Sequence, residues 1–334
     1  MSGPVRLALA ALALALIAAG PFLAPAFVTQ LAFLWVMVIL SLSWDLLGGQ
    51  MGYNSFGSII FFGIGAYAAA VAQRGGWGPG YFGGLAVGTA VGVLIAVATG
   101  IVLGSAILRM RGHYFAICTL GLAIAAGEIA SGWDYVGAGS GMVPPVFPGD
   151  PNSRGIFFYY FFAITALACF LVLRWLYGTR FGLAINAIRD DEDKAEAMGI
   201  RTTWFKTAAW TVSAVFLAIA GAGVGHLIGF IDPRQVAFAG ETYGVWMVLM
   251  AILGGSGTLW GPVIGAVVFH VTQEFFWTYF LGFQRIALGL LIVLIVVFFP
   301  QGILGFLRDR WPRLFDRSVS RPPGATVPAR GGGD

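Results

Sequence analysis

The stretch FGGLAVGTAVGVLIAVATGIVLGSAIL, residues 82–108, decides the fold class. It contains no charged residue, and it is longer than the about 20 apolar residues that a helix needs to cross a bilayer. The rest of the chain has the same character, because 58% of its 334 residues are hydrophobic and only 10% are charged. A soluble domain carries roughly a quarter charged residues. The composition therefore indicates a membrane protein and excludes a water-soluble enzyme.

Further apolar runs on both sides of this stretch predict an all-α polytopic membrane protein with about ten transmembrane or re-entrant helices. Helices are expected because each backbone polar group in lipid must be satisfied within its own segment. Such a number of crossings leaves only short connections, so no sizeable soluble domain fits. The predicted membrane domain is 1–307, with spans near 7–28, 31–47, 55–72, 82–108, 114–131, 156–177, 207–230 and 284–300 and two crossings within 243–281.

The distribution of Lys and Arg predicts the orientation, because positive residues gather in cytoplasmic loops. The basic segments are 109–113, 180–206 and 308–334, and the net acidic connections are 132–155 and 231–242. Two spans separate the first two basic segments, which places both on one side of the membrane. The basic tail reaches the same side if the run 243–281 breaks at GGSGTLWGP (254–262) and crosses twice. Both termini are therefore expected in the cytoplasm, although the short run 243–253 could instead be half of a re-entrant hairpin.

The two ends of the chain carry signals of their own. Arg6 and the following LALAALALALIAAG also fit a secretory signal with an A-x-A cleavage site at 24–26, but a second apolar run starts almost at once at Leu31. A retained first span is therefore the favoured interpretation. The tail 308–334 holds six arginines against three aspartates and is expected to be disordered and cytoplasmic. The positive charge lies beside apolar spans, so we expect contact with the lipid bilayer and no nucleic-acid binding.

The strongest polar pattern is YGTRFGLAINAIRDDEDKAEAMGIRTTWFK, residues 177–206. Asp190 is a predicted N-cap with Asp193 three residues later, and Gly199 supplies a left-handed stop. These signals predict a helix from about Asp191 to Met198. Two turns are too few for a helix that is stable alone in water, so we expect it to dock on another surface. The alternative is a solvated connector between two spans.

This segment resembles the EAA loop of bacterial ABC importer permeases, in which a short cytoplasmic helix fits a cleft on an ATPase subunit. Asp193, Lys194, Ala195 and Gly199 occupy the E-A-A-x-x-x-G positions, with Asp for Glu and Lys for the first Ala. The resemblance implies an ATPase-coupling loop at 178–206. Its implied residues are Arg189, Asp190, Asp191, Glu192, Asp193, Lys194, Ala195, Glu196 and Gly199.

From about Leu40 to Phe306 the chain is similar to the LivM-type branched-chain amino acid permeases. The matching pieces are SFGSIIFFGIGAYAAA (55–70), LRMRGHYFAICTLGLA (108–123), RFGLAINAIRDDEDKAEAMGI (180–200), GHLIGFIDP (225–233), VLMAILGGSGTLWGPVIGA (248–266) and VVFFPQGILG (296–305). The resemblance implies a permease subunit of an importer in the bacterial inner membrane. Its implied substrates are branched-chain amino acids, with urea, short amides or other amino acids as alternatives. Its implied partners are a second, LivH-like permease, two ATPase subunits of LivG and LivF type, and a periplasmic or secreted substrate-binding protein.

No lysine follows a glycine in this chain, so the sequence has no P-loop. ATP and Mg²⁺ are therefore expected on the partner ATPase subunits, and no cofactor is expected in this chain. Cys118 and Cys169 lie in apolar runs without His or Cys at ligand spacing, so neither a disulfide nor a metal site is expected. An intramembrane enzyme is disfavoured because clustered acid–base or metal-binding residues are missing, and no catalytic residue is assigned.

Two glycine-rich segments, GGQMGYNSFG (48–57) and GGSGTLWGP (254–262), allow two interpretations. They could permit close helix packing, or they could break helices and expose backbone groups along the substrate route. The order LLGG then FGIGA, and ILGG then VIGA, suggests a weak internal repeat. The candidate route glycines are Gly48, Gly49, Gly57, Gly63, Gly254, Gly255 and Gly257.

Ionisable residues deep in the predicted spans are scarce. His270 lies deepest, and a neutral, hydrogen-bonded packing role is the favoured interpretation of it. A proton- or sodium-coupled transporter would need ionisable groups near the middle of the bilayer. Their scarcity disfavours that alternative.

Overall fold

The computed structural model describes residues 15, 17–280, 289 and 302–310. Residues 7–14 and 16 of the predicted span 7–28, the predicted span 284–300 apart from residue 289, and the tail beyond Arg310 lie outside these residues. The described helices are α2 (Val28–Leu47), α3 (Ile59–Arg74), α4 (Gly80–Ile107), α5 (Gly112–Gly132), α6 (Pro151–Tyr177), α7 (Arg180–Asp190), α8 (Glu192–Ala197), α9 (Thr202–Ile228), α10 (Val245–Gly254), α11 (Gly261–Tyr279) and α13 (Gly302–Arg310). Six helical segments in this part are long and apolar enough to cross a membrane. The predicted all-α polytopic fold is confirmed.

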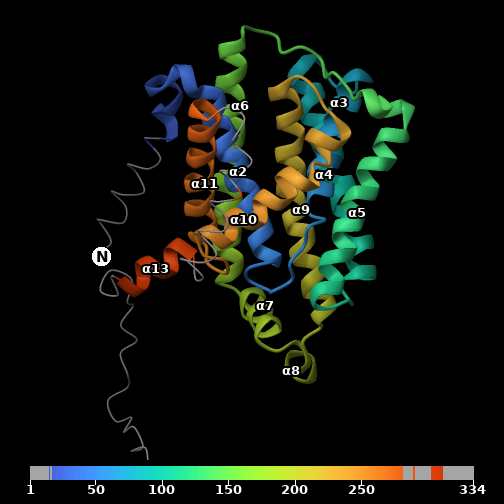
Figure 1. The fold of residues 1–334 in the computed structure, drawn as a ribbon. Helices are drawn as coiled ribbons and strands as arrows, with labels where there is room; N and C mark the ends of the chain where they lie inside the picture. The colour runs from blue at the N-terminus through green and yellow to red at the C-terminus, as the bar shows by residue number, and fades with distance from the viewer. Residues whose placement is uncertain (1–14, 16, 281–288, 290–301, 311–334) are drawn as a thin grey trace, which may run out of the picture.

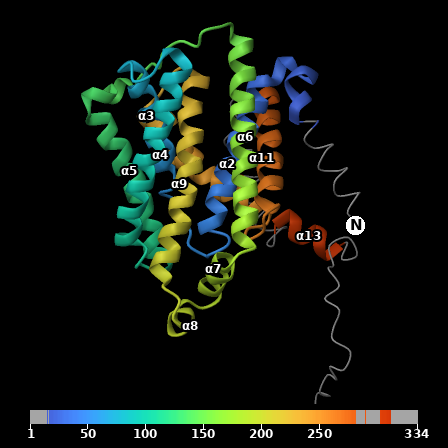
Figure 2. The same ribbon diagram turned by 180° about the vertical axis from the view of Figure 1, so that it is seen from behind.

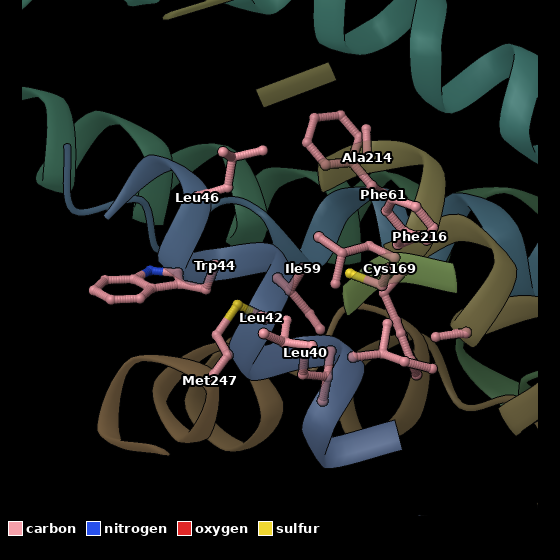
Figure 3. Packing of buried hydrophobic residues seen from close by; sticks show 14 of the residues in the cluster. Leu40, Leu42, Trp44, Leu46, Ile59, Phe61, Cys169, Ala214, Phe216 and Met247 are labelled. Carbon is pink, nitrogen blue, oxygen red and sulfur yellow. The ribbon is translucent and has the colours of Figure 1, made fainter. Parts of the chain in front are cut away.

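Helix α2 lies at the centre of the bundle and packs against α6, α9, α10 and α11 (Figures 1 and 2). Every residue from 36 to 48 is buried, which is the pattern of a helix that is apolar on all sides and surrounded by neighbours. Leu40, Leu42 and Trp44 contribute to this core, together with Met247 of α10 and Cys169 of α6 (Figure 3). The C-terminal end of α2 is therefore as deeply buried as its middle.

Small residues bring a second group of helices together. Helices α3, α4 and α9 pack pairwise, and a Cβ atom on Gly88 of α4 would lie 2.6 Å from Ala69 Cα of α3. Helix α5 stands at the edge of the bundle (Figure 1). Several of its large side chains are exposed, among them Tyr114, Ile117 and Ile124. Close backbone approach is how helices associate where lipid gives no hydrophobic drive. The glycines of α4 therefore allow close packing with the neighbouring helices α3 and α9.

The predicted break in the run 243–281 is confirmed, because α10 ends at Gly254 and α11 begins at Gly261. Helix α10 has 10 residues and a length of ~15 Å, about half of the bilayer core. Two short helical turns, Pro233–Ala237 and Gly240–Gly244, precede it and extend the apolar segment to 22 residues. The expected acidic connection at 231–242 is therefore partly helical, because its turns pack on α3 and α5.

The predicted relation between the first two basic segments is confirmed. Helices α7 and α8 lie at one end of the bundle, where Arg111 Nη1 approaches Asp193 Oδ1 to 2.6 Å (Figure 1). We call this the α8 end. The connection between α5 and α6 lies at the opposite end, and α13 lies toward the α8 end. That the α8 end faces the cytoplasm remains a prediction.

Candidate functional site

The polar segment between α6 and α9 forms two short helices instead of one. Helix α7 is capped by Thr179, whose hydroxyl accepts a hydrogen bond from the N–H of Phe181. Helix α8 is capped by Asp191, whose carboxylate accepts a hydrogen bond from the N–H of Lys194 at 3.0 Å. The prediction of Asp190 as the cap was wrong by one residue, because Asp190 still belongs to α7. Asp191 has the extended backbone, with φ −164°, that an N-cap residue needs.

The predicted left-handed stop is confirmed at Gly199, whose φ is +87°. Glycine adopts this conformation without the penalty that a Cβ atom brings. Ile200 N–H then bonds back to the carbonyl of Ala195, which turns the chain toward α9. The geometry of α8 is therefore set locally at both ends.

Glu192 anchors α8 on the membrane bundle. Its Oε1 lies 2.7 Å from Lys206 Nζ of α9, and its Oε2 accepts a hydrogen bond from the Tyr53 hydroxyl. Lys206 is only 1% exposed, and its ammonium lies 3.0 Å from Tyr53 Oη and 4.6 Å from the centre of the Tyr53 ring. Ala195, on the same short helix, is buried in the core. Helix α8 therefore docks on the helix bundle of its own chain.

Arg111, immediately before α5, adds an outer clamp. Its guanidinium lies 3.4 Å from Glu192 Oε2, 2.6 Å from Asp193 Oδ1 and 3.8 Å from Glu196 Oε2. These groups are largely exposed, apart from Glu192, and exposed pairs contribute little to stability. The ion pairs of Arg111 therefore position α8 but add little to the stability of the fold.

The charged state of Glu192 follows from its neighbours. Burial alone would raise its pKa, but hydrogen bonds from Lys206 and Tyr53 and the positive charges of Lys206 and Arg111 outweigh burial. The pKa of Glu192 is therefore held below its ordinary 4.5. Burial and the adjacent Glu192 carboxylate raise the pKa of Tyr53, which stays a hydrogen-bond donor. The contact between α8 and α9 is an ion pair at neutral pH.

Sequence reasoning missed Tyr53, Arg111 and Lys206 as members of this site. A signal existed for Lys206, because it lies near the start of an apolar span, where a buried ammonium needs an acidic partner. The acidic loop just before that span supplies one. Tyr53 gave no such signal, because it lies 139 residues before Glu192 in the sequence.

The outward side of α7 and α8 carries both charged and apolar groups. Asp190, Asp193 and Lys194 are exposed, and so are Leu183 and Met198, which is 83% exposed. We call Leu183, Asp190, Asp193, Lys194 and Met198 the outer coupling surface.

The two glycine-rich segments are breaks between helices, and they meet at the α8 end. The first separates α2 from α3 and the second separates α10 from α11. A Cβ atom on Gly49 would lie 2.5 Å from Gly257 N, and one on Gly257 would lie 3.0 Å from Gly49 O. Asp45 Oδ1 also accepts a hydrogen bond from the N–H of Gly257 at 2.8 Å. Close packing and helix breaking, the two interpretations of these segments, therefore apply together.

The remaining candidate glycines fall into two groups. Gly48 lies against the Trp44 ring, and Gly254 and Gly255 lie against Gly261 at the junction of α10 and α11. Gly57 and Gly63 lie farther along, against Thr119 of α5 and the ring of Phe238. Gly63 is inside α3 and interrupts no helix. A role of any of these glycines in the substrate route remains a prediction.

The other polar residues singled out in the sequence have structural surroundings. His270 is buried with Nε2 2.9 Å from the carbonyl of Gln30, which agrees with a packing role. Cys118 and Cys169 are free thiols. Within the described ranges, no three His, Cys, Asp or Glu side chains are grouped as a metal ion would require.

Apolar spans broken at glycines, with a polar helix pair at one end, define a multi-pass all-α membrane protein. Residues 26–299 match the family described as the permease component of branched-chain amino acid transport systems. The chain belongs to this family.

Several curated proteins are similar to this chain. The high-affinity branched-chain amino acid transport system permease protein LivM of Salmonella typhimurium is 28% identical over 307 residues, covering 82% of this chain and 69% of that protein. LivM of Escherichia coli K12 is 28% identical over 330 residues, covering 89% and 74%. The permease protein LivH of Salmonella typhimurium is 27% identical over 143 residues, covering 42% and 45%. No solved structure matches.

Proposed function

We propose that this chain is a permease subunit of a bacterial ABC importer that carries branched-chain amino acids across the inner membrane. The match of residues 26–299 to the family of such permease components is the observation that carries the proposal. The relatives named LivM and LivH are permease proteins of branched-chain amino acid transport systems. This chain would form part of the translocation route together with a second, LivH-like permease.

The driving force comes from separate ATPase subunits of LivG and LivF type, which contact the outer coupling surface on α7 and α8. The exposed Met198 and Leu183 supply apolar contacts, and Asp190 and Asp193 supply charge. Closure of two ATPase subunits around ATP would move α8, and the buried Glu192–Lys206 pair would pass that movement to α9. A ligand shifts such an equilibrium only by binding the two states differently.

A periplasmic or secreted binding protein delivers the substrate to the end opposite α8. An amino acid is zwitterionic, so an apolar route can pass it only where polar groups satisfy its charged ends. Backbone groups freed at helix breaks are suited to this task. The breaks at 48–58 and 255–260 are the candidate sites for such contacts. Urea, short amides and other amino acids remain alternative substrates.

The test is reconstitution of this permease with its partner permease, ATPase subunits and binding protein in proteoliposomes. ATP-dependent uptake of radiolabelled leucine, isoleucine and valine is expected, with urea and acetamide as competing substrates. Uptake of urea but not of leucine would overturn the assignment of the substrate.

The coupling role of the outer surface is tested by Met198→Asp. Because Met198 is 83% exposed, the substitution should leave the permease folded, while a charge in an apolar contact should lower ATPase co-purification and uptake about tenfold. Val146→Asp is the matched control, because Val146 is 87% exposed at the opposite end of the bundle. Equal retention of the ATPase subunits in both variants would contradict docking at this surface.

A further inference from the structure

Asp45 is a buried carboxylate that the coupling site does not use. It lies near the end of α2 and is 1% exposed. Among the described residues it has no basic partner within ion-pair distance, and its carboxylate accepts one hydrogen bond, from the N–H of Gly257. A buried acid with so few partners is costly to the fold. Its presence at this position needs a functional reason.

The hydrogen bond to Gly257 joins the two glycine-rich breaks. The backbone of Asp45 holds the first break, because its carbonyl accepts hydrogen bonds from the N–H groups of Gly49 (2.9 Å) and Gln50 (2.8 Å). Its side chain holds the second break through Gly257, which has a φ of +76°. One residue therefore contacts both breaks, although Asp45 and Gly257 are 212 residues apart in the sequence.

The coupling helices contact this junction from outside. A Cβ atom on Gly257 would lie 3.5 Å from Arg189 Nη1, and one on Gly52 would lie 3.5 Å from Arg189 Cγ. Arg189 is the penultimate residue of α7, and Tyr53, beside Gly52, bonds to Glu192 of α8. Both coupling helices thus touch the first break, and the first break is tied to the second through Asp45.

The remaining packing connects these two parts of the molecule only in a few places. Helices α7 and α8 pack mainly on α6 and α9, whereas α10 and α11 pack mainly on each other, on α2 and on α13. A movement that starts at α7 and α8 therefore reaches α10 and α11 through α2, through the contacts of Arg189 with Gly257 and of Phe170 with Trp260, and through the junction of the breaks. The Asp45–Gly257 bond is the polar connection at that junction.

We propose that Asp45 is a positioning residue that latches the two glycine-rich breaks together, so that movement of α7 and α8 also moves α10 and α11. The requirement is an acceptor oxygen facing Gly257 rather than a negative charge. This role rests on the proposed importer function, because it concerns how ATP hydrolysis is coupled to transport.

The first experiment compares Asp45→Asn, which keeps an acceptor oxygen, with Asp45→Leu, which removes it at similar volume. In the reconstituted complex, the ratio of amino acid imported to ATP hydrolysed should fall about tenfold or more for Leu and stay within about threefold for Asn. Ser213→Ala is the control, because it deletes another buried hydrogen bond to α2, from Ser213 Oγ to the Ser43 carbonyl at 2.6 Å. It should change the ratio much less than Asp45→Leu does, because the packing of α2 on α9 remains. If Asp45→Leu does not assemble, Asp45→Ala provides the same comparison.

The second experiment reads the latch without transport. Hydrogen exchange of peptides covering 254–260 in the full-length protein in nanodiscs should speed up about tenfold for Asp45→Leu and little for Asp45→Asn. Unchanged exchange in Asp45→Leu overturns the latch, and so does equal uncoupling by Leu and Asn. A wild-type complex that imports no amino acid would instead refute the proposed function, while the exchange comparison would still decide the latch.

Discussion

At the α8 end Asp45 is buried and Glu192 is mostly shielded from solvent, and the two carboxylates are held in different ways. Glu192 has a lysine, a tyrosine hydroxyl and an arginine as partners, whereas Asp45 has a single backbone N–H. The contacts of Glu192 hold α8 firmly on α9. The single hydrogen bond of Asp45 is a weaker connection between the two breaks. From this difference we expect α8 to move as one body with α9, and the connection between the two breaks to be the easier one to disrupt.

The largest expected effect comes from breaking the ion pair between Glu192 and Lys206 with Lys206→Met. Removing the ammonium leaves Glu192 with only Arg111 and Tyr53 as partners, so the cost should stay below the about 3–5 kcal/mol that the loss of one partner of a fully buried pair brings. We expect a lower thermal unfolding midpoint in detergent and faster proteolysis of the 191–199 segment.

The other lysine of the chain is the matched control for Lys206→Met. Lys194 is 83% exposed and pairs only with Asp191 at the surface. Lys194→Met should leave the unfolding midpoint unchanged within error. Equal effects of the two substitutions would show that the buried pair is not the anchor of α8.

A smaller effect is expected at the end of α8. Gly199→Pro forces a residue with φ near −65° into a position with φ +87°, so the turn toward α9 must change. We expect about tenfold lower uptake with ATP hydrolysis and membrane insertion retained, because strain of about 1–3 kcal/mol shifts the position of α8 without unfolding the bundle.

Charge reversal of Asp190, which is exposed, should uncouple transport in the same way while Asp193 stays paired with Arg111 and Glu192 with Lys206. For Gly199→Pro, the milder control is Gly199→Asn, because Asn tolerates the left-handed region better than most other side chains. Normal uptake in Gly199→Pro and in the charge-reversed variant would contradict a rigid lever at this position.

The smallest effect is expected from acid. Because the pKa of Glu192 lies below its ordinary 4.5 in the folded protein, its ion pair stabilises the fold above that value. The stabilisation is lost as the pH falls through the lowered pKa. A protonated carboxyl can still form hydrogen bonds, so the loss should be smaller than in Lys206→Met.

Hydrogen exchange of peptides covering 191–198, corrected for its intrinsic pH dependence, would measure this acid effect. Protection should persist at pH 5 and decrease only under more acidic conditions. The double variant Lys206→Met/Glu192→Gln has neither charge and should lose this pH dependence. An unchanged acid transition in the double variant would assign it to another group.

Parts of the site could be predicted from local sequence. The break between Gly254 and Gly261 and the stop at Gly199 were predicted correctly, because glycine acts on the backbone where it stands. The cap of α8 was placed one residue early. Both Asp190 and Asp191 are good caps, and the choice depends on where α7 ends, which its packing on α6 and α9 decides.

The sequence by itself determined that the chain is an all-α membrane protein and that two of its basic segments share one end. Hydrophobicity and charge are properties of each segment alone, and the bilayer acts on each segment separately. Only the tertiary structure decided that Glu192 meets Tyr53 and that Asp45 meets Gly257, partners 139 and 212 residues apart. Those contacts depend on which helices pack together, and packing between apolar helices in lipid is set by shape, which no single segment specifies.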